Sequence, residues 1–182
     1  MKLLWLDLET EGLDPATCSI LEVAVSVADL ASPLNATPLY HAVLGTSDER
    51  VSKLHPIVFD MHTKNGLLTE CLRSGKTVAD VERDLLALIP ASPDKEEMPV
   101  LAGSSIHFDH SFLRVHCPEL SGRLSHRHYD VTAVKFFCQS LGMAKPPKAE
   151  AAHRAAEDIV ASIEDARRCV DFVRGMGGEM FP

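Results

Sequence analysis

The chain has 182 residues, 46% of them hydrophobic, which predicts a single domain with a sizeable core. Its formal net charge of −8 argues against a broad basic surface for long nucleic-acid duplexes, because such binding depends on Lys and Arg that neutralise phosphates. The negative charge is still compatible with a short nucleic acid held through metal ions, which bring their own positive charge.

Residues 2–12 read Lys-Leu-Leu-Trp-Leu-Asp-Leu-Glu-Thr-Glu-Gly and predict a buried strand that ends in acids. Asp7 and Glu9 lie on the same face, roughly 6–7 Å apart at ~3.3 Å rise per residue. Two buried carboxylates at this distance repel each other and are costly to desolvate, and a cation between them removes both penalties. The alternative is an exposed strand end with solvated acids, but the leucine-rich flanks favour burial. Side chains alternate between the two faces of a strand. One face therefore carries Leu4, Leu6 and Leu8, and the other carries Leu3, Trp5, Asp7 and Glu9.

Two further strands are predicted next, over residues 19–29 and 39–44, with Pro33, Asn35 and Pro38 in the connection between them. The short connections indicate an antiparallel meander. Residues 47–72 predict short helices and loops. Residues 77–89 predict an amphipathic helix, in which Thr77 and Asp80 can form a capping box.

After a charged loop at residues 90–99, strands alternate with helices. Strands are predicted over 99–106 and 128–131, and helices over 107–120, 135–141 and 152–176, with a proline-containing loop at 145–148. The last helix has an apolar stripe made by Ala155, Ile159, Ile163, Ala166, Val170 and Val173. We therefore expect an α/β fold, a mixed sheet with helices on its faces, in one domain over residues 1–176, followed by a flexible tail over residues 177–182.

Cysteines and apolar segments favour a cytoplasmic protein without a membrane anchor. The five cysteines form no Cys-x-x-Cys pair, which argues against zinc ribbons and redox motifs and fits reduced thiols. No apolar stretch approaches the ~20 residues that span a bilayer. Because acids interrupt the N-terminal apolar run, we expect no signal peptide.

Three more residues are candidates for the chemistry of the first strand. Asp109 follows the fourth strand and opens a helix, where it could also be an ordinary first-turn acid. Asp158 lies at the edge of the last helix's apolar stripe and could instead be solvated. His153 precedes it by five positions, about 500° of helix, so we expect His153 on the preceding loop or first turn.

Together these residues resemble a known family. Asp7-Leu8-Glu9, Asp109 and the segment from His153 to Asp158 resemble the DEDD-type 3′–5′ exonucleases of the His-containing subclass. Within them, the whole chain is similar to oligoribonucleases, through residues 3–9 with 12–15, His62-Thr63 with Gly66-Leu67, residues 103–113 and Arg127-x-x-Asp130-Val131. The resemblance implies a ribonuclease H-like fold with three antiparallel strands and then parallel strands, divalent-metal dependence and a homodimer.

The chemistry of phosphodiester hydrolysis agrees with this set. Two metals ~3.5–4 Å apart can hold the attacking and leaving oxygens, and carboxylate oxygens suit Mg²⁺ or Mn²⁺. Asp7, Glu9, Asp109 and Asp158 would bind the metals. His153 would take the proton from water, because imidazole is a competent base near neutral pH.

The resemblance also assigns a substrate, single-stranded RNA down to dinucleotides, cut from the 3′ end into 5′-mononucleotides. It places Leu13 at a base-wedging position and His62 at a substrate contact. Ser105, Arg127 and Thr132 fall at positions that hold the 5′ phosphate; the planar fork of arginine suits that group, although a surface ion pair is the alternative for Arg127.

This sequence departs from the family at three places. Thr10-Glu11 replaces a common Met-Thr, so an extra acid could repel phosphate or alter backbone contacts. Ile57 stands near the family's second base-stacking aromatic, and His126 replaces the aromatic before Arg127. These changes keep a preference for short DNA open as an alternative.

Other classes fit less well. An aspartyl-nucleophile phosphatase usually has Asp where this chain has Glu9, and it leaves His153 and Arg127 without a role. An HD-type phosphohydrolase needs His-Asp, whereas the order here is Asp109-His110. A non-catalytic nucleic-acid-binding module conflicts with the acidic charge and the intact acid set.

Overall fold

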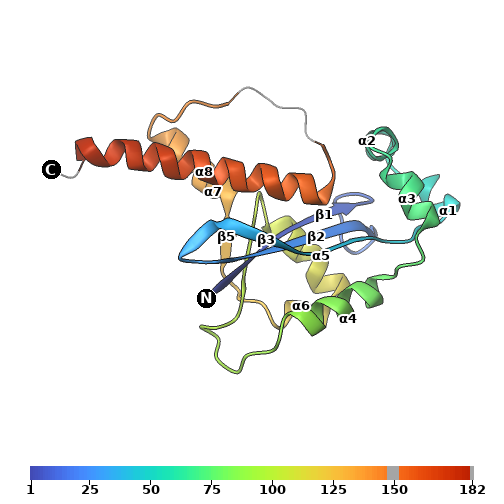
Figure 1. Cartoon of the computed structure of the whole chain (residues 1–182). Helices are drawn as coiled ribbons and strands as arrows, with labels where there is room; N and C mark the ends of the chain where they lie inside the picture. The colour runs from blue at the N-terminus through green and yellow to red at the C-terminus, as the bar shows by residue number, and fades with distance from the viewer. Residues whose placement is uncertain (147–151, 181–182) are drawn as a thin grey trace.

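A five-stranded mixed sheet forms the centre of the protein, in the order β3-β2-β1-β4-β5 (Figure 1). The computed structural model describes residues 1–146 and 152–180. The strands are β1 (Lys2–Thr10), β2 (Ile20–Asp29), β3 (Ser32–Val43), β4 (Val100–Gly103) and β5 (His128–Asp130). The first three are antiparallel neighbours, whereas β4 pairs parallel with both β1 and β5. The predicted α/β architecture is confirmed.

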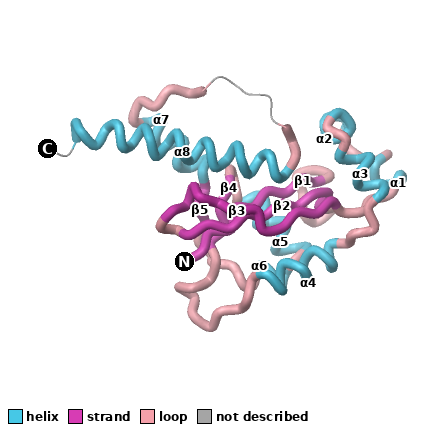
Figure 2. Tube along the Cα trace, viewed as in Figure 1, coloured by secondary structure: helices cyan, strands magenta, loops and turns pink. Residues whose placement is uncertain are grey.

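Helices cover both faces of this sheet (Figures 1 and 2). The long α8 lies along one face with α7 beside it, and α4, α5 and α6 cover the other face. Three short helices, α1 to α3, gather beyond the C-terminal end of β1. Their bounds are α1 (Asp48–Val51), α2 (Pro56–Lys64), α3 (Leu67–Arg73), α4 (Val78–Leu88), α5 (His107–His116), α6 (Pro118–Ser121), α7 (Val131–Ser140) and α8 (Ala155–Met180).

The two faces of β1 belong to two different cores, as the alternation predicts. Leu4, Leu6 and Leu8 pack with residues of α4, α5 and α6. Leu3 and Trp5 pack against α8. Because side chains alternate along a strand, Asp7 and Glu9 continue the α8 face toward the end of β1.

The third strand begins earlier than predicted. It starts at Ser32 instead of Leu39, so Pro33 and Pro38 lie inside it. Proline removes a ladder donor, but β3 is an edge strand, where that loss is tolerated. The pairing with β2 shifts register at Pro38, opposite Ser26.

Helix boundaries also differ from the prediction in places. The helix expected over 107–120 is two helices, because Pro118 cannot continue α5. α7 begins at Val131 because Asp130 caps it, with its carboxylate accepting from the amides of Thr132 and Ala133. The capping box of Thr77 and Asp80 is confirmed at α4.

The buried face of α8 is rotated from the predicted stripe near its C-terminal end. Ser162 and Cys169 are buried, whereas Val173 is exposed. The helix also runs to Met180, past the predicted end at Met176. The flexibility of a tail stays a prediction, and residues 147–151 and 181–182, which include part of the predicted loop, lie outside the described residues. No helix among the described residues is long and apolar enough to cross a membrane.

Candidate active site

A bulge directly follows the acids of the first strand. Glu9 pairs with Glu22 of β2, but Thr10 pairs with Ile20, so one extra residue interrupts the ladder. Bulges re-aim side chains, and they are frequent beside active sites. Glu9 and Glu22 are the last regular cross-strand pair before the bulge, and a pair of acids there is destabilising unless cations compensate it.

Asp109 reaches the same end of β1 from the first turn of α5. β4 ends at Gly103, where it passes so near β1 that a Cβ would lie 2.9 Å from the carbonyl oxygen of Leu6. The chain then turns into α5, and the Oδ1 of Asp109 accepts a hydrogen bond from the amide of Leu8 at 2.9 Å. Asp109 is buried and bonded to β1 through this contact, so it is not a solvated first-turn acid.

His153 and Asp158 complete the group from the start of α8. Glu9, His153 and Asp158 each offer a ligand atom within 4.8 Å of the others. His153 lies on the loop just before α8, as its spacing from Asp158 indicates, with a left-handed backbone at φ 50°. Such a conformation costs a residue other than glycine about 1–3 kcal/mol and persists only where neighbouring contacts enforce it.

The carboxylates of this group face mainly one another, and the charge of Arg154 compensates Glu9 only weakly. Burial raises the pKa of Asp7 to about 9, and the neighbouring charges of Asp109, Glu9 and Asp158 add to it. Burial and Asp158 raise the pKa of Glu9 to about 8, burial raises that of Asp109 to about 7, and burial raises that of Asp158 as well. Oxygen ligands with concentrated negative charge fit a divalent cation, so these residues form a candidate metal site.

His62 lies beside the same acids on α2. Its side chain is fully buried, and its Nε2 is 3.7 Å from the Oε2 of Glu9. Neither ring nitrogen has a hydrogen-bond partner among the described residues, although the nearby Thr10 backbone favours the charged ring. Burial nevertheless lowers the pKa of His62. A buried imidazole without a hydrogen-bond partner is rare, so His62 stays a candidate for contacting a group bound at Glu9.

The predicted phosphate-binding residues come together only in part. The hydroxyls of Ser105 and Thr132 are 3.1 Å apart at the start of α7, and Oδ1 of Asp130 accepts from both their amides. The side chain of Arg127 instead contacts Glu96, with Nη1 3.4 Å from Oε2. Arg127 precedes β5 and Thr132 follows it, so about 10 Å of strand separates them.

The predicted base-contacting positions face solvent. Leu13, in the loop after β1, is 84% exposed, and Ile57 on α2 is 71% exposed. His126 is exposed as well. Side chains this exposed can contact a ligand without any rearrangement of the core.

Glu11 differs from the sequence expectation of an extra acid that repels phosphate. Its side chain is buried and accepts hydrogen bonds from Nε of Arg50 at 2.8 Å and from the amide of Ser19 at 2.9 Å. Arg50 also bonds it through Nη2. Because Arg50 neutralises it, Glu11 adds no net charge to the site.

Three residues beside the site were not predicted, namely Glu22, Asn65 and Arg154. Arg154 donates from Nε and Nη2 to Glu22, at 2.9–3.1 Å, and Asn65 donates to the carbonyl of His153. Glu22 could have been noticed, because it is the only charged residue in the apolar run from Ile20 to Ala28. The partners of Arg154 lie too far away in sequence to leave a local signal.

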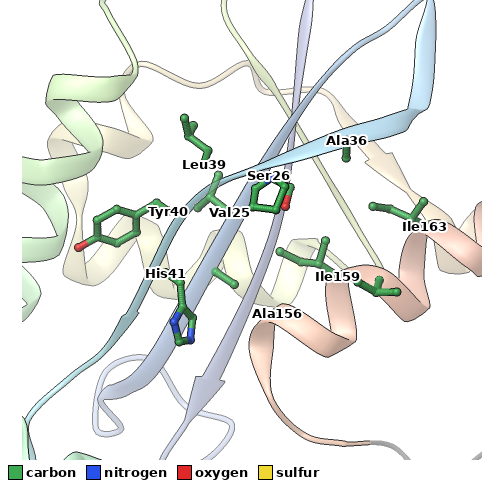
Figure 3. A pocket seen from close by; sticks show the side chains of 12 residues that line it. Val25, Ser26, Ala36, Leu39, Tyr40, His41, Ala156, Ile159 and Ile163 are labelled. Carbon is green, nitrogen blue, oxygen red and sulfur yellow. The ribbon is translucent and has the colours of Figure 1, made fainter.

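A hollow lies between the sheet and α8, and Figure 3 shows it from close by. Ile159 and Ile163 of α8 face Ala36 and His41 of β3 across it. The lining is mainly apolar and includes no carboxylate. His41 joins this groove to the site, since its Nε2 is 2.7 Å from Glu22 Oε1.

The sequence of this chain is similar to those of known exonucleases and oligoribonucleases. The Exonuclease (RNase T) family model matches residues 4–165. A probable oligoribonuclease from Schizosaccharomyces pombe is 32% identical over 165 residues, which are 88% of this chain and 64% of the relative. The oligoribonuclease of Corynebacterium diphtheriae is 34% identical over 167 residues, which are 90% of this chain and 79% of that relative.

Solved structures share the fold. The structure of product-bound exonuclease I aligns with 99% of this chain, with a TM-score of 0.67 at 15% sequence identity. The aligned part is 46% of the exonuclease I chain. E. coli exonuclease I in complex with a dT13 oligonucleotide matches 96% of this chain and 44% of its own, with a TM-score of 0.66 at 16% identity. The chain therefore belongs to the exonuclease family and, within it, to the oligoribonucleases.

Proposed function

We propose that this chain is a metal-dependent 3′–5′ exonuclease that degrades short oligoribonucleotides, down to dinucleotides, to 5′-mononucleotides. The observation that carries the proposal is the cluster of carboxylates around Glu9, with the ligand atoms of Glu9, His153 and Asp158 within 4.8 Å of one another. Membership of the oligoribonuclease family supports RNA as the substrate.

Asp7, Glu9, Asp109 and Asp158 would hold two divalent ions, Mg²⁺ or Mn²⁺. The raised pKa values of Asp7 and Glu9 support this assignment, because a bound cation favours the ionised carboxylates. When bound, such ions polarise the phosphate and stabilise the charge that develops on the attacking and leaving oxygens.

The chain's own residues would do the remaining chemistry. His153 accepts a proton from the attacking water, whose oxygen bonds to phosphorus as the bond to the 3′ oxygen of the preceding nucleotide breaks. The departing 3′ oxygen takes up a proton from solvent and leaves as a hydroxyl. The nearby carboxylates of Glu9 and Asp158 then stabilise the imidazolium. His62, buried against Glu9, bonds the terminal nucleotide.

The substrate's two ends would meet different residues. Leu13 packs against a base, which its exposure allows. The paired hydroxyls of Ser105 and Thr132, at the N-terminus of α7, bond the 5′ phosphate. Arg127 would have to exchange its exposed contact with Glu96 for this phosphate, at little cost, because exposed ion pairs are weak.

We also propose a homodimer and a cytoplasmic location. Phe136 and Phe137 on α7 are 65% and 61% exposed, and self-association that covers them would be favourable. Sedimentation of the wild type and of a Phe136→Ser, Phe137→Ser variant tests the dimer. Cell fractionation tests the location.

The deciding experiment compares initial rates on matched 5′-phosphorylated RNA and DNA oligomers of two to seven nucleotides, with Mg²⁺ or Mn²⁺. We expect the RNA dinucleotide to be the fastest substrate. Faster cleavage of DNA would indicate the alternative that the departure at Ile57 leaves open. Binding without metal-dependent release of mononucleotides would indicate a non-catalytic module.

Arg127→Ala tests the measurement of substrate length in the same assay. We expect it to slow cleavage of the dinucleotide far more than cleavage of a longer oligomer. Equal losses on both would remove Arg127 from the phosphate site.

A further inference from the structure

We infer that Asn65 and Arg154 are positioning residues that hold His153 beside Glu9 and Asp158. The inference rests on the proposed function, in which His153 accepts the proton from water. Neither residue was assigned a role from the sequence. Their contacts explain why the loop before α8 adopts a conformation that its residues do not favour.

The backbone of His153 needs such support. At φ 50° its side chain is crowded by its own backbone, which is why this region favours glycine. The Nδ2 of Asn65 donates to the carbonyl oxygen of His153 and lies 3.4 Å from that of Ala152. The Oδ1 of Asn65 accepts from the amide of Leu67 at 3.1 Å, which fixes the orientation of the amide group.

Asn65 also couples the loop to α2. It caps the C-terminal end of this helix, which carries His62. The same short segment therefore supports both histidines that lie beside Glu9. A shift of Asn65 would move the His153 loop relative to His62.

Arg154 holds the other side of His153. Its guanidinium donates to both carboxylate oxygens of Glu22 on β2, and to Glu70 on α3 at 2.9 Å from Nη1 and Nη2. The amide of Ala155 donates to Oε2 of Glu22 at 3.0 Å. Two forked contacts thus attach the residue after His153 to two elements that are fixed in the core.

Charge alone could give Arg154 a different role, because its positive charge also favours the ionised form of Glu9. Asn65 separates the two explanations. It is neutral, so its removal loosens the loop and leaves the charge of the site unchanged. A positioning role therefore predicts that Asn65→Ala and Arg154→Ala have similar effects.

The first test measures kcat and KM of Asn65→Ala, Arg154→Ala and Arg154→Lys on the RNA dinucleotide with saturating Mn²⁺. We expect kcat to fall roughly 10- to 100-fold in both alanine variants, with a much smaller change in KM. Arg154→Lys should stay well below the wild type, because lysine keeps the charge but cannot form both forks. Arg167→Ala is the control, since Arg167 is on the same helix with an exposed partner, Glu164.

A second readout needs neither metal nor substrate. Amide hydrogen exchange over residues 153–158 should be faster in Asn65→Ala and Arg154→Ala than in the wild type, and unchanged in Arg167→Ala. Unchanged exchange in both alanine variants would overturn the inference, because their contacts would not be what holds the loop.

Double variants with His153→Ala decide between positioning and general structural damage. If Asn65 and Arg154 act through His153, their removal should not lower kcat further in the His153→Ala background. An equal loss in both backgrounds, or a wild-type kcat in the single variants, would overturn the inference and leave the proposed function intact. If His153→Ala itself is fully active, the role of His153 fails, and the inference fails with it.

Discussion

Four acidic side chains at the ends of β1 and β2 form two contrasting pairs. Burial raises the pKa of Asp7 to about 9 and that of Glu9 to about 8, and nearby carboxylates reinforce the shift. Burial acts the same way on Glu11 and Glu22, but the arginines and the backbone amides of Ser19 and Ala155 together outweigh it and lower both pKa values.

The difference lies in where the positive charge comes from. The chain supplies Arg50 for Glu11 and Arg154 for Glu22, whereas Asp7 and Glu9 face mainly other acids. Glu9, Glu11 and Glu22 are all buried, so burial by itself does not distinguish a structural acid from a ligand. An acid whose cation must come from outside the chain is the better candidate for a metal ligand.

Asp7→Asn tests this contrast and should have the largest effect of the variants, on metal-dependent activity. We expect metal-dependent activity to fall on the order of 10³-fold, because a ligand is lost. The free energy of unfolding without metal should stay equal or rise, because repulsion is relieved. Rates with Mn²⁺ and urea unfolding with a chelator check both parts. A large loss of metal-free stability would contradict the assignment.

The pH dependence of stability should sharpen the contrast between the two pairs of acids. The carboxyls of Asp7, Glu9 and Asp109 bind protons more tightly when folded, so their contribution to stability is complete below about pH 4 and is lost as pH rises to about 9. Metal-free protein should therefore become less stable over this range, with a shallower slope in Asp7→Asn. Mg²⁺ or Mn²⁺ should oppose the loss, because it binds the folded state. Calorimetry across the range, with and without metal, measures this, and an equal slope in the two proteins would argue against it.

Glu22→Gln should have the opposite signature to Asp7→Asn. Removing the charge of a buried partner leaves Arg154 partly uncompensated, so we expect the free energy of unfolding to fall by about 3 kcal/mol, with or without metal. Glu70→Gln is the matched control, because Glu70 binds the same guanidinium but is half exposed, and it should cost less than about 1 kcal/mol. Equal losses in urea unfolding would show that burial does not decide the difference.

Local sequence patterns were sufficient to predict part of the fold. Alternation from Leu3 to Glu9 predicts both faces of β1, because a period of two does not depend on what the strand packs against. The start of β3 was predicted too late because of its prolines. Proline is tolerated in an edge strand, and the sequence does not show which strand lies at an edge. The arginine partners of Glu11 and Glu22 could not be predicted from local patterns, because Arg50 is 39 residues from Glu11 and Arg154 is 132 residues from Glu22.

Glu11→Gln should give the smallest effect. Glutamine can still accept from the amide of Ser19, and Arg50 is half exposed, so we expect a loss of about 1 kcal/mol in the free energy of unfolding. The kcat and KM for the RNA dinucleotide should stay within about two-fold, which is a free-energy change below 0.5 kcal/mol. A clear drop in KM would mean that Glu11 repels phosphate despite Arg50. The division into paired structural acids and unpaired ligands would then fail at Glu11, two residues before the exposed Leu13.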